Sequence, residues 1–377
     1  MMQNGGMCVY MTENVNCANV GIMTWHYATN IGSNLQAYAM QYIIEHQNKR
    51  PIFLNYRGRT PADSGLRKAL KILCSSVDEH FPNLLPERVR VQAYHFQNQY
   101  LKMTESLVTN EQLFGCSRHL QCIVCGSDQI WAPNVYDPVY QLSFCNEKTK
   151  KCAYAASIGL PEIPKELILE YQKNLRRFDY ITAREKQGAA LLSSILDKKI
   201  PWVLDPTMLV PLKEWENLSK RPEAREPYLF CYFLGGNQIH RKMAKRYAKV
   251  NNLKIICCSD YPEDKAIFNC TISHMGPREF LGYIENCTMS FTDSYHGILF
   301  SMIFRKDFYT VHRFHGDDKI CQNSRVDSIL ELTGLSRRCL SDDEATVTNE
   351  PIDYVQVDTL LEEKRIESLQ HLRNCLT

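Results

Sequence analysis

The feature that most constrains this chain is a repeated alternation of short apolar runs with stretches whose apolar residues recur at helical spacing. The first unit joins an expected strand at 19–25 to an expected helix at 33–46 through a short polar loop. Ser33 and Gln36 predict a capping box at the start of this helix. Strands that alternate with helices form parallel sheets covered by helices on both faces. The pattern therefore predicts an α/β fold.

The alternation occurs in two successive parts of the chain, separated by a charged stretch with two prolines at 217–227. Before it we expect further strands at 51–55, 119–125, 151–157 and 179–183, helices near 93–109, 163–177 and 185–196, and a mixed, partly helical connection at 57–92. After it we expect strands at 228–234, 253–258 and 288–292, and helices at 238–250, 277–286 and 297–304.

This division predicts two Rossmann-like domains that face a cleft, and the length of 377 residues fits two domains. We place the N-terminal domain at 1–216 and the C-terminal domain at 228–340. Residues 341–377 form a C-terminal extension, with a helix near 356–375 that could pack back on the first domain.

Charge and hydropathy exclude several classes of protein. The net charge is +2 with acids and bases intermixed, which argues against a nucleic-acid partner. The first 48 residues contain no Lys or Arg, so the basic start of a secretory signal is missing. No apolar run approaches the roughly 18–20 residues of a membrane span. We expect a soluble, cytoplasmic protein without a transmembrane segment, and a peripheral position at the inner face of the membrane stays open.

The 16 cysteines do not show the spacing of a disulfide framework or a metal site. Most lie in apolar, strand-like runs, where reduced cysteines behave as small hydrophobic residues. Cys122 and Cys125 form a C-x-x-C pair, but this spacing on a strand directs the two side chains to opposite faces. No second pair of this kind completes a zinc set. We therefore predict no metal site.

The loops that follow the strands are the places to search for a functional site, because ligands of open parallel sheets bind beyond the carboxyl ends of the strands. Four of these loops are rich in small polar residues, at 26–33, 126–129, 182–187 and 292–297. The first two contribute the candidate acceptor or cleft residues Asn30, Ser33, Ser127, Asp128 and Gln129.

The loop at 292–297 has the sharpest pattern. It reads Thr-Asp-Ser-Tyr-His-Gly, and an apolar helical stretch follows directly. His296 is therefore expected at a helix N-terminus, where free N–H groups and the helix dipole attract anions. Asp293 or Ser294 acting only as a helix cap would account for the same residues. The residues alone leave a cap and an active site equally open.

Arg184 is the second candidate, because it follows an expected strand and opens the next helix. A cation at a helix N-terminus opposes the dipole, so a nearby anion would explain it, although Glu185 or solvent could satisfy it instead. Arginine is well suited to bidentate binding of carboxylate or phosphate. Gly235 and Gly236 follow a strand without the G-x-G-x-x-G pattern, which disfavours a dinucleotide cofactor.

Six segments in chain order resemble the polysaccharide pyruvyltransferase family. They are NIGSNLQAYA at 30–39, VCGSDQIW at 124–131, AYAAS at 153–157, ARE at 183–185, DPT at 205–207 and TDSYHG at 292–297, the last continued by FSMIF at 300–304. The DPT segment taken by itself reads as a turn. The resemblance covers roughly residues 19–335.

The resemblance implies a glycosyltransferase-B-like fold and a transferase that moves pyruvate from phosphoenolpyruvate to a saccharide, forming a pyruvate ketal in cell-surface or capsular polysaccharide biosynthesis. Phosphoenolpyruvate is then a co-substrate, and no cofactor is expected. The acceptor is either free or lipid-linked. The donor site implied by the resemblance comprises Arg184, Ser294, Gly297, Lys319 and Arg325, with a looser alignment at the last two.

His296 is implied as a donor contact or as the acid or base of the reaction. Asp293 or Asp128 would be its partner. Two other readings remain: a glycosyltransferase of the same architecture that uses a nucleotide sugar, and a non-catalytic module that binds sugars or anions.

Overall fold

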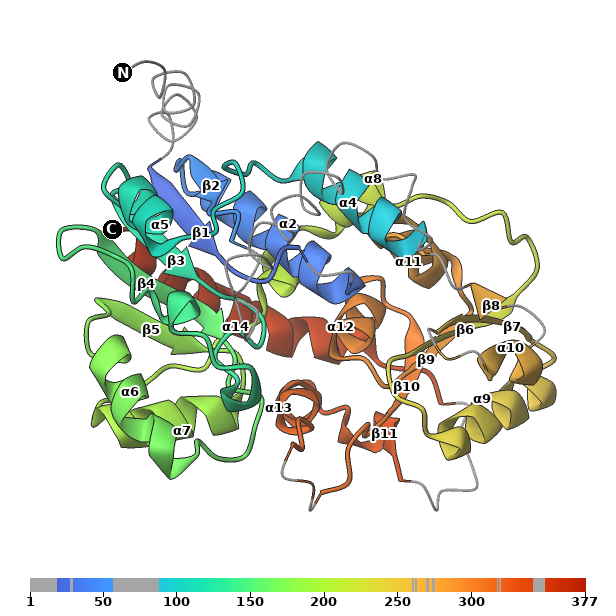
Figure 1. The fold of residues 1–377 in the computed structure, drawn as a ribbon. Coiled ribbons are helices and arrows are strands. Elements are labelled where there is room, and N and C mark those ends of the chain that lie inside the picture. The colour runs from blue at the N-terminus through green and yellow to red at the C-terminus, as the bar shows by residue number, and fades with distance from the viewer. Residues whose placement is uncertain are drawn as a thin grey trace.

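The computed structural model describes residues 19–27, 30–56, 88–259, 261, 263–268, 271–272, 275–316, 318, 320–341 and 350–377. Two parallel sheets lie side by side, each with helices packed against it (Figure 1). This arrangement confirms the predicted pair of Rossmann-like units. Most of the connection predicted at 57–92 lies outside the described residues.

The first sheet has the strand order β2-β1-β3-β4-β5, and all its pairs are parallel. Its strands are β1 (Val20–Met23), β2 (Pro51–Phe53), β3 (Cys122–Cys125), β4 (Lys150–Ala156) and β5 (Tyr180–Ala183). Its helices include α2 (Ile31–Glu45), α4 (Arg88–Tyr100), α5 (Asn110–Ser117), α6 (Lys165–Leu175) and α7 (Lys186–Leu196). The strand order reverses between β1 and β3, and a crevice for ligands is expected at such a switch point.

The second sheet has the order β11-β10-β9-β6-β7-β8, again with parallel pairs. Its strands are β6 (Tyr228–Phe233), β7 (Lys254–Ser259), β8 (Thr271–Ile272), β9 (Met289–Thr292), β10 (Asp307–Val311) and β11 (Cys339–Leu340). Its helices are α9 (Gln238–Val250), α10 (Asp264–Ile267), α11 (Pro277–Asn286), α12 (Tyr295–Ile303) and α13 (Ser324–Leu332). The strand order reverses here between β6 and β9.

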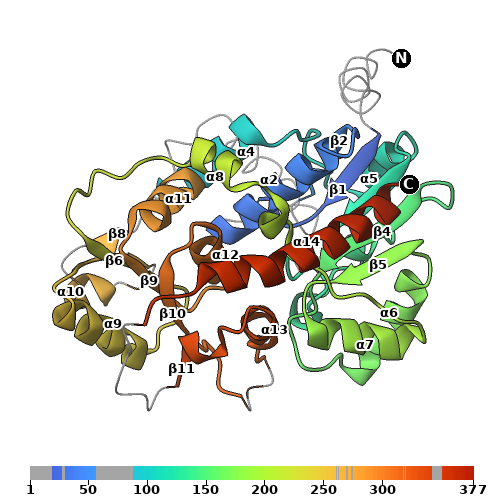
Figure 2. The same ribbon diagram turned by 180° about the vertical axis from the view of Figure 1, so that it is seen from behind.

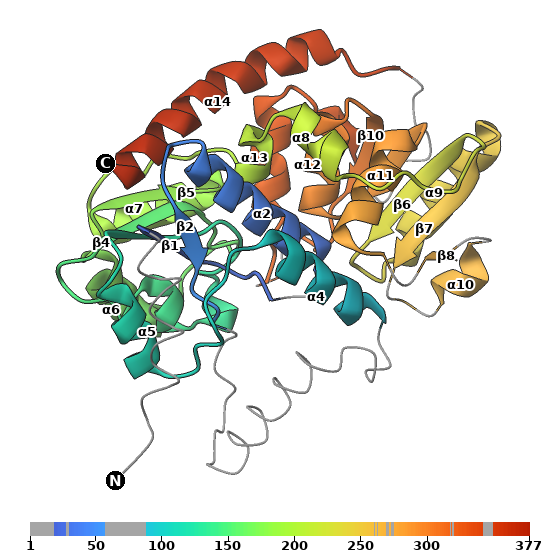
Figure 3. The same cartoon turned by 90° about the horizontal axis from the view of Figure 1, so that it is seen from above.

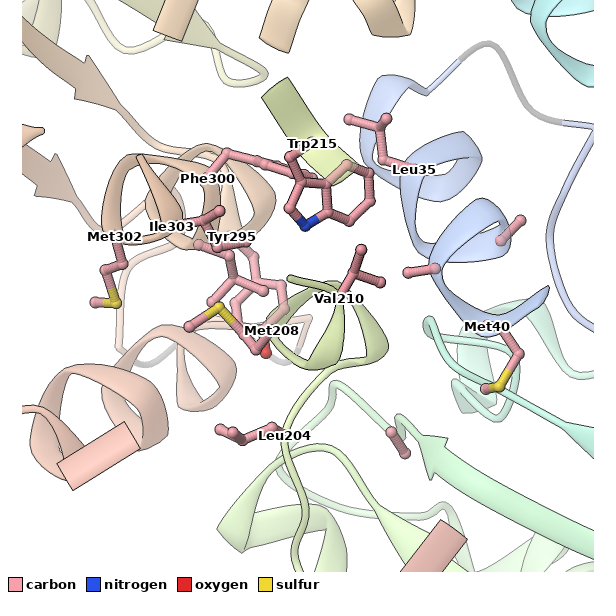
Figure 4. Close-up of a cluster of buried hydrophobic side chains, with 14 of the residues drawn as sticks. Leu35, Met40, Leu204, Met208, Val210, Trp215, Tyr295, Phe300, Met302 and Ile303 are labelled. Atoms are coloured by element: carbon pink, nitrogen blue, oxygen red, sulfur yellow. The ribbon is translucent and has the colours of Figure 1, made fainter. Parts of the chain in front are cut away.

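A shared apolar core joins the two halves. After β5 the chain forms the short helix η4 (Pro206–Leu209) and then α8 (Leu212–Leu218). Trp215 of α8 is fully buried, and its ring lies edge-on to Phe300 of α12 at a centroid distance of 4.9 Å. Figure 4 shows Trp215 between Leu35 of α2 and Phe300. The ring of Trp215 also lies 5.7 Å from that of Tyr38 of α2, so this side chain links α2 to α12 within the shared core.

The C-terminal helix α14 (Tyr354–Leu376) connects the two halves on the other side, where it runs across the back of the molecule (Figure 2). Its last turn packs on the first sheet, because the carbonyl of Cys375 accepts hydrogen bonds from the thiols of Cys122 (3.6 Å) and Cys152 (3.1 Å). Ser368 Oγ accepts a hydrogen bond from the backbone N–H of Leu204 at 3.0 Å. Across the described ranges, no helix has both the length and the hydropathy to cross a membrane.

Two predicted helices have different bounds in the structure. The first helix begins at Ile31, and its N-cap is Asn30, whose Oδ1 accepts from Ser33 N at 3.1 Å. The predicted capping box at Ser33 is therefore wrong, because the equally favourable cap Asn30 comes first and frees the Ser33 hydroxyl. The helix predicted at 93–109 ends at Tyr100, and a separate helix starts after Thr109, which forms a capping box with Gln112.

The cysteine prediction agrees with the sheet geometry. Cys122 lies in the core on the α14 side of the first sheet, whereas Cys125 lies in the core on the opposite side. Within the described part of the chain the cysteines are free thiols. They therefore contribute to packing rather than to a covalent framework.

Candidate active site

The loops at the two switch points converge where helices α2 and α12 begin. Gly32 lies in the first turn of α2, and a β-carbon added to it would lie 2.2 Å from Nδ1 of His296 in the first turn of α12. The imidazole therefore fills the space left by the missing side chain. Two helix N-termini that meet in this way form a natural site for an anion.

A buried polar network extends from this contact, and we define it by Ser33, Ser127, Asp128, Arg184, Asp205 and His296. Ser33 Oγ donates to Asp128 Oδ2 at 2.6 Å. Arg184 donates to Asp205 at 3.0 Å and lies 3.4 Å from Asp128, so one guanidinium bridges two carboxylates. Ser127 Oγ donates to Asp205 Oδ2 at 3.0 Å. The network brings together three predicted loops of the first half, the segment that contains Asp205, and the loop of His296.

The local backbone explains why the first-half motif contains glycine. Gly126 has φ +111° and lies so close to strand β4 that a β-carbon would fall 2.1 Å from the carbonyl oxygen of Tyr154. Only glycine accommodates both conditions. This close approach turns Ser127 and Asp128 toward Arg184.

The charges of the network stabilise the ionised state of both carboxylates. Burial by itself raises the pKa of Asp205, but His296 and Arg184, together with the hydrogen bond from Thr207 N, outweigh it and hold the pKa well below its ordinary value. Burial likewise opposes the ionisation of Asp128, and Arg184, His296 and the Ser33 hydroxyl lower its pKa. Both aspartates are therefore anions at neutral pH.

His296 is a member of the network that keeps free bonding capacity, as is Arg184 through its Nε, among the described residues. Its Nε2 lies 3.7 Å from Asp205 Oδ2, which is too long for a hydrogen bond, and no described residue is a hydrogen-bond partner of this buried nitrogen. The side chain is only 8% exposed. A buried imidazole nitrogen of this kind is available to exchange a proton with a bound molecule.

The other residues of the 292–297 loop serve to hold it. Asp293 accepts backbone N–H bonds from Leu234 (2.7 Å) and Gly235 (2.8 Å), so it ties together the loops after β6 and β9. Ser294 is the N-cap of α12 and accepts from Gly297 N at 3.4 Å. Asp205, rather than Asp293, is the carboxylate beside His296. Asp293 thus occupies a structural position, and its predicted catalytic role gains no support from this geometry.

Two further arginines approach the site from the second half. Arg325 of α13 and Arg184 both lie over the ring of Tyr295, at 5.7 and 4.8 Å from its centroid. Burial and the positive charges of Arg184 and Arg313 lower the pKa of Arg325 to about 10. In the described ranges neither Arg325 nor Arg313 forms an ion pair with a carboxylate. The site therefore holds positive charge that the described acidic side chains do not directly neutralise.

The remaining predicted residues lie apart from this network or outside the residues that the structure describes. Asn30 is exposed and caps α2. Gln129 points toward Gly159, whose absent β-carbon leaves room for its side chain amide. Lys319 lies outside the described residues. The part of the chain that is described contains no group of three or more His, Cys, Asp and Glu side chains arranged to hold a metal ion.

Sequence reasoning missed Arg313 and Tyr295 and undervalued Asp205. Arg313 follows β10, a strand that was not predicted, so the rule about carboxyl ends of strands could not be applied to it. Its Nε is buried and has no partner among the described residues, and Nη2 donates to the Asp293 carbonyl at 3.4 Å. Asp205 follows a short apolar run, and its position beside Arg184 depends on folding of the whole first half.

The paired sheets, with their polar loops meeting at both switch points, define the architecture of glycosyltransferase-B-like enzymes. Residues 30–311 match the family described as polysaccharide pyruvyl transferase. The chain belongs to this family, and it is a transferase of polysaccharide biosynthesis. The comparison with curated protein sequences gives no significant match.

One solved structure supports the fold, and two others are reported for their similarity. The UDP-GlcNAc 2-epimerase of Methanocaldococcus jannaschii is 13% identical, with 92% of each chain covered and a TM-score of 0.50. MurG of Acinetobacter baumannii is 8% identical over 94% of this chain and 95% of its own, with a TM-score of 0.40. The wall teichoic acid polymerase TagF is 11% identical over 96% of this chain and 84% of its own, with a TM-score of 0.46. At these identities the likeness concerns the fold alone.

The contact between Gly32 and His296 leads to a first prediction. In the Gly32→Ala variant the new methyl group displaces the imidazole, and we expect kcat to fall about a hundredfold because misplacement of a reacting group by about 1 Å has this effect. Steady-state kinetics measures it. Gly115→Ala is the matched control, since a β-carbon there meets no atom within 4 Å. Equal kcat values for the two variants would contradict the prediction.

Proposed function

We propose that this chain transfers the pyruvyl group of phosphoenolpyruvate to two hydroxyl groups of a saccharide and forms a cyclic pyruvate ketal. The observation that carries the proposal is the convergence of Arg313 and Arg325 with the buried His296. Among the described residues, neither arginine has a carboxylate partner and Nε2 of the histidine has no hydrogen bond. The family assignment supports the transferase class.

Charge is the first reason to prefer this donor. Phosphoenolpyruvate is small and carries a phosphate and a carboxylate, so it requires several donors within a short distance. The N-termini of α2 and α12 supply backbone N–H groups, and Arg313 and Arg325 supply guanidinium groups. Arg184 engages Asp128 and Asp205 with its two Nη atoms, and its Nε has no partner within the described ranges. It positions the carboxylates and is proposed to contact the donor through this Nε.

The proposed reaction requires acid and base steps, and the position of His296 supports a role for it in them. Protonation of the methylene carbon of phosphoenolpyruvate converts it to a methyl group and makes C2 electrophilic. One sugar hydroxyl then forms a C2–O bond and loses its proton, the C2–O bond to phosphate breaks, and a second hydroxyl closes the ketal. Of the protons released by the two hydroxyls, one balances the proton taken up by carbon and the other leaves with phosphate. We assign the carbon-protonation step to His296, with Asp205 as the adjacent counter-charge.

The direct test incubates the full chain with phosphoenolpyruvate and a panel of glycosides that includes galactosides. Mass spectrometry should detect a pyruvate ketal, accompanied by stoichiometric phosphate release. Thermal denaturation provides a second reading, because a ligand that binds only the native state raises Tm. Stabilisation by nucleotide sugars but not by phosphoenolpyruvate would favour an ordinary glycosyltransferase. Binding of glycosides without phosphate release across the panel would favour a non-catalytic module.

Arg325 provides a prediction that separates donor binding from stability. In the Arg325→Gln variant we expect KM for phosphoenolpyruvate to rise about 10- to 100-fold, since a hydrogen bond to a charged group contributes about 1.5–3 kcal/mol. The lowered pKa of Arg325 indicates that the folded protein without donor disfavours the charged guanidinium. The Tm of the Arg325→Gln variant should therefore equal or exceed that of the unmodified chain. Arg337→Gln, at a side chain that is 71% exposed, is the control. A lower Tm with unchanged KM would assign Arg325 to structure alone.

A further inference from the structure

Helix α9 carries a row of exposed positive charge that the proposed reaction does not use. Its sequence contains five basic residues and no acidic residue. Arg241 is buried and pairs with Asp264 at 2.8 Å. The other four are exposed, are three or four positions apart, and share one side of the helix: Lys242, Lys245, Arg246 and Lys249. We call these four residues the basic row.

No described acidic side chain neutralises the charge of the basic row. Within the described ranges none of its members forms an ion pair. Like charges three and four positions apart on a helix repel one another and destabilise the helix. A bound anion would remove this repulsion. The net charge of the whole chain is only +2, which makes this face a local concentration of charge. Figure 3 shows α9 at the outer edge of the second sheet, away from the first sheet.

An apolar pocket of about 800 Å³ opens beside the basic row. Its walls are mostly apolar and include Tyr228 of β6, Ile256 of β7 and Phe268 after α10. Lys245 and Lys249 of the basic row also line it, together with Arg225 and Lys254. Glu226 is the one acidic residue of the lining, and it pairs with Lys254. The pocket therefore combines an apolar interior with an excess of cations.

The combination of an apolar pocket with nearby cations distinguishes between two classes of anionic partner, nucleic acids and phospholipids. A nucleic acid would engage the cations through its phosphates but would leave the apolar pocket unused. A phospholipid carries an anionic head and an apolar chain on one molecule, and it complements both features. Val250 next to the row is 73% exposed and adds apolar surface at the same end of the helix. Anionic lipid surfaces attract basic segments of this kind.

We propose that this face docks on an anionic bilayer, with lipid phosphates meeting the basic row and one acyl chain entering the pocket beside Lys245 and Lys249. The contact is peripheral. It is reversible by salt, because exposed charges are screened at high ionic strength.

The test is sedimentation of the full chain with vesicles of phosphatidylcholine, alone or with about one third phosphatidylglycerol. We expect binding only to the anionic vesicles and its loss at about 0.5 M salt. Replacing all four residues of the basic row by glutamine should weaken binding about a hundredfold or more, since each cation contributes about fivefold. Glutamine is a good helix former, so the fold should persist, as circular dichroism would verify.

A charge-matched control removes three lysines and one arginine from the exposed surface of the other half: Lys165→Gln, Arg176→Gln, Lys198→Gln and Lys199→Gln. This control should bind anionic vesicles as the unmodified chain does. Ala224→Trp, which narrows the pocket, should weaken vesicle binding about tenfold while the salt dependence remains. Equal losses in both quadruple variants would attribute binding to net charge and overturn the proposal.

Two further outcomes would also overturn the proposal. One is no binding to anionic vesicles at low salt. The other is binding of a DNA duplex, but not of vesicles, through the basic row. Unchanged vesicle binding by Ala224→Trp would overturn the acyl-chain part. Because no substrate is present, each result is independent of the proposed reaction.

Discussion

The His296→Ala variant is expected to form the ketal with kcat lowered about a hundredfold to ten-thousandfold, the range that a positioned general acid or base contributes. The imidazole is buried against Gly32, so its position is set by the meeting of α2 and α12. Its Nε2 lies 3.7 Å from Asp205 and has no hydrogen-bond partner in the part of the chain that the structure describes. Donor binding should change much less, because the cations of the site remain.

Single-turnover measurements and thermal shifts with phosphoenolpyruvate separate these two effects. His119→Ala is the matched control, because His119 is exposed and lies outside the site. It should retain the kcat of the unmodified chain. A near-normal kcat of the His296→Ala variant at saturating donor would show that His296 does not perform the proton transfer. This conclusion holds whether or not the ketal is the product.

The second large effect is expected for Asp205→Asn. Asp205 accepts from Arg184, Ser127 and Thr207, and its side chain is fully buried. The asparagine has nearly the same shape but no charge, so the Arg184 guanidinium loses one of its two buried carboxylates. Removing one partner of a buried ion pair costs about 3–5 kcal/mol of the free energy of unfolding. Denaturant titration measures this loss.

The pH dependence gives an independent signature. The pKa of Asp205 is lowered by folding, so its stabilising contribution is present above the unfolded-state pKa of about 4 and is lost as the pH falls toward the folded-state pKa. The free energy of unfolding of Asp205→Asn should therefore depend less steeply on pH below about 4 than that of the unmodified chain. Asp358→Asn is the control, because its partner Arg305 is 60% exposed and such surface pairs contribute about 1 kcal/mol or less. Similar losses in the two variants would show that the Arg184 bridge has no special role.

Much of the fold follows from local pattern. The strand and helix periodicities predicted two parallel sheets, and they indicated most elements of the first half and the first elements of the second. Of the elements after α12, the C-terminal helix α14 was predicted, whereas β10, α13 and β11 were not. Strand β11 has two residues, and the loop before α13 has no clear periodicity. The loops at 26–33, 126–129, 182–187 and 292–297 were found because polar residues at carboxyl ends of parallel strands follow a general rule.

The sequence by itself thus determined the α/β class, the candidate loops and the presence of Arg184 and His296 among them. Only the tertiary structure decided how these residues are connected. It placed Asp205 beside His296, turned Asp293 to the backbone after β6, and brought Arg313 and Arg325 to the site. The physical reason is that loop partners lie far apart along the chain. Their distances are set by the packing of α2 and α12 on Trp215 of α8, and no local pattern records that packing.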